Sequence, residues 1–168
     1  MQFGRGRISV GAGDKIELAL SESSLPYEYG IIELNFGKIR MRSANGLLET
    51  DSTFNNRYIS FRGIEWTNSS SIVISLSESV IYSGVNRPFD FAYLNPISSH
   101  LEIELNNRQN KQGSDSGNGV WQLSLDWMVK PFMRFSGNLL FDEFVLDEIE
   151  KDAGNEHGYA YSSQIRYY

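Results

Sequence analysis

The sequence of 168 residues contains no cysteine. This absence excludes a disulfide framework and a metal site built from thiolates. It also suits a chain that crosses an oxidising periplasm before it folds. The sequence has no apolar run of about 18 residues, the length typical of a transmembrane helix. A transmembrane β-strand needs only about 9–11 residues with apolar side chains at alternate positions, so strands that cross a membrane remain possible.

Positive charge is also scarce. The 15 Lys and Arg residues are outnumbered by 21 Asp and Glu residues, which gives a net charge of −6. No basic patch stands out, so we expect no nucleic-acid partner. The first ten residues, MQFGRGRISV, lack the apolar core of a secretory signal peptide. Because an outer-membrane protein needs such a signal, we expect the chain to be a fragment of a longer precursor.

Apolar and polar residues alternate along most of the chain, as they do from Trp121 to Trp127. No segment keeps a helical period over three turns. Aromatic residues make up 13% of the chain, mostly Phe and Tyr, and they favour strands. The pattern predicts strands at residues 2–10, 15–22, 30–36, 38–47, 57–66, 71–82, 99–107, 118–128, 132–141 and 158–167.

The connections between these strands alternate in length, which is typical of outer-membrane barrels with short periplasmic turns and long outer loops. A further strand at 89–95 keeps this alternation, although 83–98 is equally well explained as one irregular loop. Residues 106–119 are poor in apolar residues and are expected to form an outer loop. The expected short turns are 11–14, 37–38, 67–70 and 130–131, and the expected long polar connections are 23–29, 48–56 and 142–157.

The predicted fold class is an all-β, antiparallel, up-and-down transmembrane β-barrel, of which residues 1–168 form one partial domain with ten or eleven strands. A soluble β-sandwich alternates in the same way, but its apolar face packs on a second sheet. Closely spaced charges of both signs on the polar faces favour a narrow enclosed lumen. Eleven strands would leave unpaired edges in lipid, so further strands are expected at one or both ends.

Several short motifs resemble the capsule assembly Wzi family. The opening stretch Phe3–Arg7, FGRGR, is followed by glycines at 11 and 13 and by an LALS stretch that ends at Ser21, with a proline at 26. Further matches follow in the same order as in the family. They are LSESVIY at 76–82, YLNP at 93–96 and FDEF at 141–144. The residues that carry the resemblance are Gly4, Arg5, Gly13, Ser21, Pro26, Glu78, Pro96 and Asp142.

The resemblance implies a large barrel in the outer membrane of a Gram-negative cell that binds capsular polysaccharide or exopolysaccharide at the surface. It implies no enzymatic activity and no cofactor. The barrel would be a monomer surrounded by outer-membrane lipid. Two alternatives stay open. One is an outer-membrane diffusion channel, and the other is a soluble carbohydrate-binding β-sandwich.

The acidic residues and His100 are explained better by structural roles than by catalysis. Glu102 and Glu104 are two apart on a predicted strand, so their carboxyl groups would lie about 6.5–7 Å apart, a spacing compatible with glycoside hydrolysis. A polar lumen face explains them better. His100 follows Ser99, but neighbours on a strand point to opposite faces, so a serine–histidine pair is not expected. The acidic stretch 142–150 lacks the spacing of an EF-hand, so no metal site is expected.

Polysaccharide contacts are expected from charged side chains on the predicted polar faces and from the outer loops. Arg40 and Arg42 form a pair whose forked donors suit an acidic sugar, although ion pairing with lumen carboxylates explains them equally well. The candidate binding residues are Arg40, Arg42, Glu102, Glu104, Asp126 and Arg134.

Overall fold

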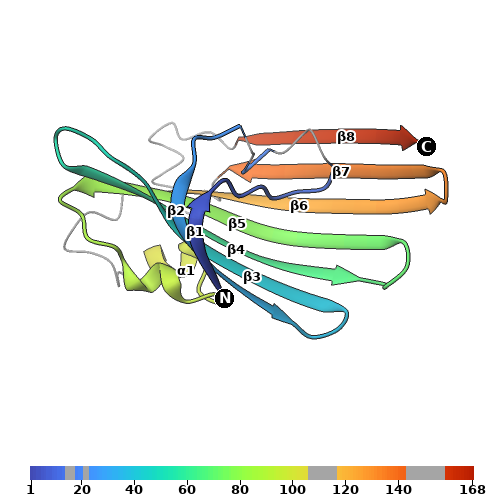
Figure 1. Cartoon of the computed structure of the whole chain (residues 1–168), viewed down its shortest axis with the longest axis horizontal. Helices are drawn as coiled ribbons and strands as arrows, with labels where there is room; N and C mark the ends of the chain where they lie inside the picture. The colour runs from blue at the N-terminus through green and yellow to red at the C-terminus, as the bar shows by residue number, and fades with distance from the viewer. Residues whose placement is uncertain (14–17, 21–22, 106–116, 143–157) are drawn as a thin grey trace.

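The computed structural model describes residues 1–13, 18–20, 23–105, 117–142 and 158–168. Its strands form one antiparallel sheet in which each strand pairs with the next along the chain, in the order β1 to β8 (Figure 1). The sheet is open, with β1 at one edge and β8 at the other. The elements are β1 (Gln2–Gly6), β2 (Tyr27–Asn35), β3 (Ile39–Thr50), β4 (Asn55–Thr67), β5 (Ile72–Val85), η1 (Phe91–Leu94), α1 (His100–Leu105), β6 (Gly117–Lys130), β7 (Met133–Asp142) and β8 (Tyr159–Tyr167).

The predicted antiparallel all-β sheet is confirmed, and eight of the predicted strands are present. The predicted strand at 2–10 ends earlier, at Gly6. The predicted strand at 15–22 lies partly outside the described residues, and within them Leu20 forms a single bridge with Val10. Of the described residues, no helix is long and apolar enough to cross a bilayer.

Two predicted strands are wrong. The segment 89–95 contains the 3-10 helix η1, because the Asp90 side chain accepts a hydrogen bond from the backbone N–H of Ala92 and caps a turn. The segment 99–107 contains the helix α1. There the Ser99 hydroxyl accepts from the backbone N–H of Glu102, as an N-cap residue does. Local side-chain capping therefore overrides the alternating apolar pattern in both segments.

Short connections gather at one end of the sheet, on the right in Figure 1, where β2–β3, β4–β5 and β6–β7 are joined. At the other end, the predicted long connection 48–56 is only the turn 51–54, because β3 extends to Thr50 and β4 begins at Asn55. The Asp51 carboxylate accepts hydrogen bonds from Thr53 and from the N–H of Asn55, and these bonds lower the pKa of Asp51.

The two faces of the sheet differ in an unusual way. Residues that alternate along a strand share a face, and directly paired residues on neighbouring antiparallel strands lie on the same side. One face, here called the belt face, carries large apolar side chains that remain exposed. This belt comprises Ile32, Leu34, Ile39, Ile64, Trp66, Ile74, Leu76, Leu123, Trp127, Phe141, Tyr159, Tyr161, Ile165 and Tyr167.

The opposite side, here called the polar face, carries small and polar side chains, many of them buried. The buried ones are Ser77, Ser79, Gln122, Ser124, Ser136 and Asn138. They are covered by the chain between β1 and β2, and two of its described parts, residues 7–13 and 18–20, are called the crossing segment below. Near β2–β4 the same segment places Ile8 in a small apolar cluster with Tyr27, Ala44, Ile59 and Phe61.

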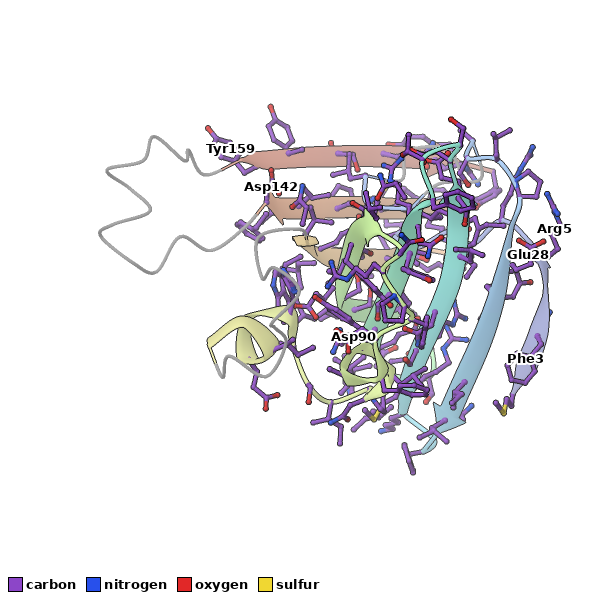
Figure 2. The ribbon with its side chains drawn as sticks, turned by 90° about the vertical axis from the view of Figure 1, so that its left-hand side faces the viewer. Phe3, Arg5, Glu28, Asp90, Asp142 and Tyr159 are labelled. Carbon is purple, nitrogen blue, oxygen red and sulfur yellow. The ribbon has the colours of Figure 1, made fainter. Side chains whose placement is uncertain are left out.

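A second segment, residues 86–105, covers the belt face at the end of the sheet opposite the short connections. This segment is here called the strap, and it contains η1 and α1. Figure 2 shows the strap, marked by Asp90, apart from the sheet edge where Arg5 of β1 lies beside Glu28 of β2. Tyr93 and Ile103 of the strap pack on Tyr58, Val80 and Tyr82 of the sheet. The two coverings therefore lie on opposite faces.

Candidate functional site

The polar face holds the crossing segment through two amide side chains, which act like strand partners. Asn138 accepts from the N–H of Ala12 at 2.7 Å and donates to its carbonyl oxygen at 2.8 Å. Gln122 accepts from the N–H of Ala19 at 3.0 Å and donates to the carbonyl oxygen of Val10 at 3.1 Å. In Figure 1 the blue trace between β1 and β2 accordingly runs over β6 and β7.

The close approach of this segment requires glycine at position 11. Gly11 has a φ of +140°, and a Cβ atom there would lie 2.8 Å from the Nε2 atom of Gln122 and 2.9 Å from Oδ1 of Asn138. Contacts under 3.0 Å would force these neighbouring atoms or the backbone to shift. A positive φ is also strained for any residue other than glycine at this position. Gly13 also has a positive φ, of +92°, so both glycines are explained by the local backbone conformation and packing.

Beside the crossing segment, charged side chains on the polar face form a row. Arg40 lies 2.6 Å from a carboxylate oxygen of Glu65 and 3.7 Å from Glu33, and Arg42 lies 3.1 Å from Glu33. On β6 and β7, the Arg134 guanidinium donates hydrogen bonds from Nε and Nη2 to the two carboxylate oxygens of Asp126, and the Nε–Oδ1 distance is 2.6 Å. The charged row, as used below, consists of Glu33, Arg40, Arg42, Glu65, Asp126 and Arg134.

Two hollows open between the charged row and the crossing segment. One, of about 150 Å³, is lined by Val10, Arg42 and Glu65 among others. The other, of about 220 Å³, is lined by the glycines at 11 and 13, by Arg40 and by the Asp126–Arg134 pair. Because Gly11, Arg40 and Glu65 line both, the hollows are adjacent. They present guanidinium donors and carboxylate acceptors together, a combination that hydrogen-bonds to hydroxyl groups.

Four of the six predicted binding residues are brought to this face: Arg40, Arg42, Asp126 and Arg134. The placement of Glu102 and Glu104 on a polar strand face is wrong, because their segment forms α1 within the strap, on the opposite side of the sheet. Glu33 and Glu65 also belong to this site and were not predicted from the sequence. Both are the acidic members of alternating strands that pair with β3, a signal available from the pattern.

The residues that carry the family resemblance do not gather at one place. Gly4 and Arg5 lie on β1, Gly13 lies in the crossing segment, and Pro26 directly precedes β2. Glu78 is buried under the strap, and Pro96 belongs to the strap itself. Asp142 ends β7, and Ser21 lies outside the described residues. The described members of this set are therefore spread across the fold and do not form a single site.

Glu78 is the centre of a buried polar cluster beneath the strap. Its carboxylate oxygens accept from the backbone N–H of His100 at 3.0 and 3.1 Å, and one lies 3.0 Å from Nε of Arg62. The side chains of Arg62 and Glu78 are only 9% and 1% exposed. The Tyr93 hydroxyl and Nδ1 of His100 lie 2.9 Å apart. This cluster fastens the strap to β4 and β5.

The described residues contain no group of three or more side chains placed to hold a metal ion. Apart from Asp142, the acidic stretch 142–150 lies outside the described residues.

In comparisons with known proteins, no family model, no curated protein and no solved structure matches this chain. The resemblance to the capsule assembly Wzi family therefore remains a prediction that rests on the short motifs alone.

Proposed function

We propose that this chain forms part of the wall of an outer-membrane β-barrel, with its belt face toward lipid and its polar face toward the barrel interior. The observation that carries the proposal is the inverted distribution of side chains across the sheet. Ile74, Leu76 and Leu123 are exposed on one face, whereas Gln122 and Ser124 are buried on the other. Outer-membrane barrels have apolar residues outside and polar residues inside.

A soluble sandwich fits these faces less well. In a sandwich the apolar faces pack on each other and the polar faces meet water. Here the polar face is the one that the crossing segment covers, whereas the described residues that cover the belt face are those of the strap, beside β4 and β5. In lipid, the backbone groups on the free edges of β1 and β8 need hydrogen-bond partners. The proposal accordingly places further strands, from the same or a neighbouring polypeptide, beside both edges.

Within this barrel, the polar face is proposed to retain polysaccharide at the cell surface. The charged row contains three guanidinium groups and three carboxylates, so it favours a ligand rich in hydroxyl groups over a strongly charged one. The crossing segment fills part of the interior, which favours a tether over the alternative of an open diffusion channel. The partly open hollows of about 150 and 220 Å³ accommodate sugar-sized groups near the wall.

The orientation in the membrane is tested with spin labels in lipid vesicles. Because the chain has no cysteine, each introduced cysteine gives one labelled site. Labels at Leu123→Cys and Ile165→Cys, on the belt, should be relaxed by oxygen, which concentrates in lipid. Labels at Ser75→Cys and Gln164→Cys, on the polar face, should respond to a water-soluble nickel chelate. Belt labels that respond mainly to the nickel chelate would contradict the barrel wall.

Polysaccharide binding is tested with the Arg42→Ala variant of the full chain in vesicles. Loss of a charged hydrogen-bond donor should weaken binding by about ten-fold, because such bonds contribute roughly 1.5–3 kcal/mol. Binding is measured by co-sedimentation of the vesicles with fluorescent dextran, a neutral polysaccharide, and with polygalacturonate, an acidic polysaccharide. Arg5→Ala is the control, because Arg5 pairs with Glu28 at the exposed edge of the sheet, away from the hollows. Equal binding by both variants and the original chain would count against the site.

A further inference from the structure

A third hollow, of about 350 Å³, continues the two hollows of the polar face toward the short connections. It is lined by the turn between β4 and β5 and by the Asp126–Arg134 pair. Because Val73, Asp126 and Arg134 also line the hollow of about 220 Å³, the two adjoin. That hollow in turn adjoins the one of about 150 Å³. The three hollows therefore form one groove, here called the wall groove.

The wall groove runs along β5. Its lining on that strand begins at Ser77 in the first hollow, passes Ser75 and Val73, and reaches Ile72 in the third. A strand rises about 3.3 Å per residue, so the stretch from 77 to 72 spans about 17 Å. The groove then continues past the end of the strand along the β4–β5 turn, at the right-hand end of the sheet in Figure 1. A ligand that fills the groove is therefore long and narrow.

The charged side chains along the wall groove are paired. Arg40 lies 2.6 Å from Glu65 where the first two hollows meet, and Arg134 binds Asp126 where the second hollow meets the third. All four side chains keep 18–39% of their surface exposed, so a ligand in the groove can reach them. The groove therefore offers hydrogen-bond donors and acceptors side by side with little net charge. Sugar hydroxyl groups, which both donate and accept, match this arrangement.

The third hollow adds hydroxyl groups to the wall groove. Ser69, Ser70 and Ser71 line it, and the first two are exposed. The turn that carries them is held in shape by the side-chain oxygen of Asn68, which accepts hydrogen bonds from the backbone N–H groups of Ser70, Ser71 and Ile72 at 2.8 to 3.0 Å. A turn that is ordered in advance loses little entropy when it binds a ligand.

We propose that the wall groove binds a linear, uncharged polysaccharide that lies parallel to the strands, with successive sugars in the three hollows. The Arg40–Glu65 and Arg134–Asp126 pairs hydrogen-bond to hydroxyl groups along the chain, and Ser70 contacts the sugar at the turn. This proposal rests on polysaccharide binding by the polar face. It goes beyond that function by specifying an unbranched ligand segment and by adding a subsite at the β4–β5 turn.

The experiment uses the full chain in lipid vesicles and compares the original chain with Ser70→Trp and Ser52→Trp. An indole at position 70 fills the third hollow. Ser52 is the matched control, because it is also an exposed serine in a turn, between β3 and β4 at the opposite end of the sheet. The probe is fluorescent dextran, whose binding is measured by co-sedimentation. The competitors are isomaltose and isomaltotetraose, the disaccharide and tetrasaccharide of the dextran backbone.

For the original chain and Ser52→Trp, isomaltotetraose should displace dextran at about ten-fold lower concentration than isomaltose, because the longer sugar adds hydrogen bonds in the further hollows. Ser70→Trp should remove most of this advantage while isomaltose competes as before, which also shows that the variant is folded. Equal competition by the two sugars in the original chain would overturn the wall groove. So would an advantage that survives in Ser70→Trp or that Ser52→Trp also removes.

The same measurements separate this proposal from the binding function on which it rests. If the wall groove is overturned but Arg42→Ala still weakens dextran binding, the polysaccharide site stands and only its extension to the turn is refuted. If the original chain binds no dextran, both proposals fail together.

Discussion

Replacement of Glu78 by alanine should lower the free energy of unfolding by about 3–5 kcal/mol, because removal of one partner from a buried ion pair leaves an uncompensated charge. The remaining charge is on Arg62, whose side chain is 9% exposed. The same substitution removes the two hydrogen bonds that Glu78 accepts from the backbone of His100. The substitution should therefore weaken both the attachment of the strap and the packing of the sheet beneath it. Urea-induced unfolding followed by tryptophan fluorescence measures the change.

The matched control is Glu65→Ala, which breaks the ion pair with Arg40 on the polar face. The Arg40 and Glu65 side chains are 38% and 28% exposed, so water screens their charges. Such pairs contribute about 0–1 kcal/mol, and the loss should be correspondingly small. A Glu78→Ala chain that is no less stable than Glu65→Ala would mean that the cluster under the strap does not hold the fold together.

Replacement of Ile74 by arginine should make folding into lipid vesicles less favourable by about 2–4 kcal/mol, the cost of a cation on the lipid face of a barrel near the bilayer midplane. Ile74 lies on the belt, 40% exposed, between β4 and β6. Ser75→Arg, one residue further along, should cost much less. Ser75 points to the polar face, where it lines a hollow with the Arg40–Glu65 and Asp126–Arg134 ion pairs, so a guanidinium there lies among charged side chains instead of lipid.

Folding into vesicles is measured by urea titration, with the tryptophan emission of the chain as the signal. The comparison is sharp because the two positions are adjacent and the introduced residue is the same. On a protein surrounded by water, an exposed Ile→Arg change typically alters stability by less than about 0.5 kcal/mol. Equal effects at positions 74 and 75 would therefore contradict the assignment of the belt to lipid.

The alternating pattern was sufficient to predict most strands and both faces of the sheet. Side chains two apart on a strand share a side, so residues such as Arg40, Arg42 and Asp126 could be placed on the polar face without a structure. The strap was mispredicted because Phe89, Phe91 and Tyr93 alternate as in a strand. The better signal was Ser99 with Glu102 three residues later, a capping-box spacing that favours a helix start.

The crossing segment could not be predicted from local sequence. Its bonds join Ala12 to Asn138 and Ala19 to Gln122, across 126 and 103 residues of chain. The alternation of apolar and polar residues does not predict which distant segment an amide side chain will contact. The same limit applies to the hollows beside the charged row, since their shape depends on where Gly11 and Ala12 cross the sheet.

These long-range bonds also have a consequence for the order of assembly. The part of the chain that is synthesised first acquires its cover over the sheet only after β6 and β7 exist to receive it. Contacts between such distant positions form slowly, because the entropy of closing the intervening chain is lost before any bond rewards it. The connection between β1 and β2 is thus expected to settle late, and the amino-terminal edge should be the last part of the sheet to resist proteolysis during refolding.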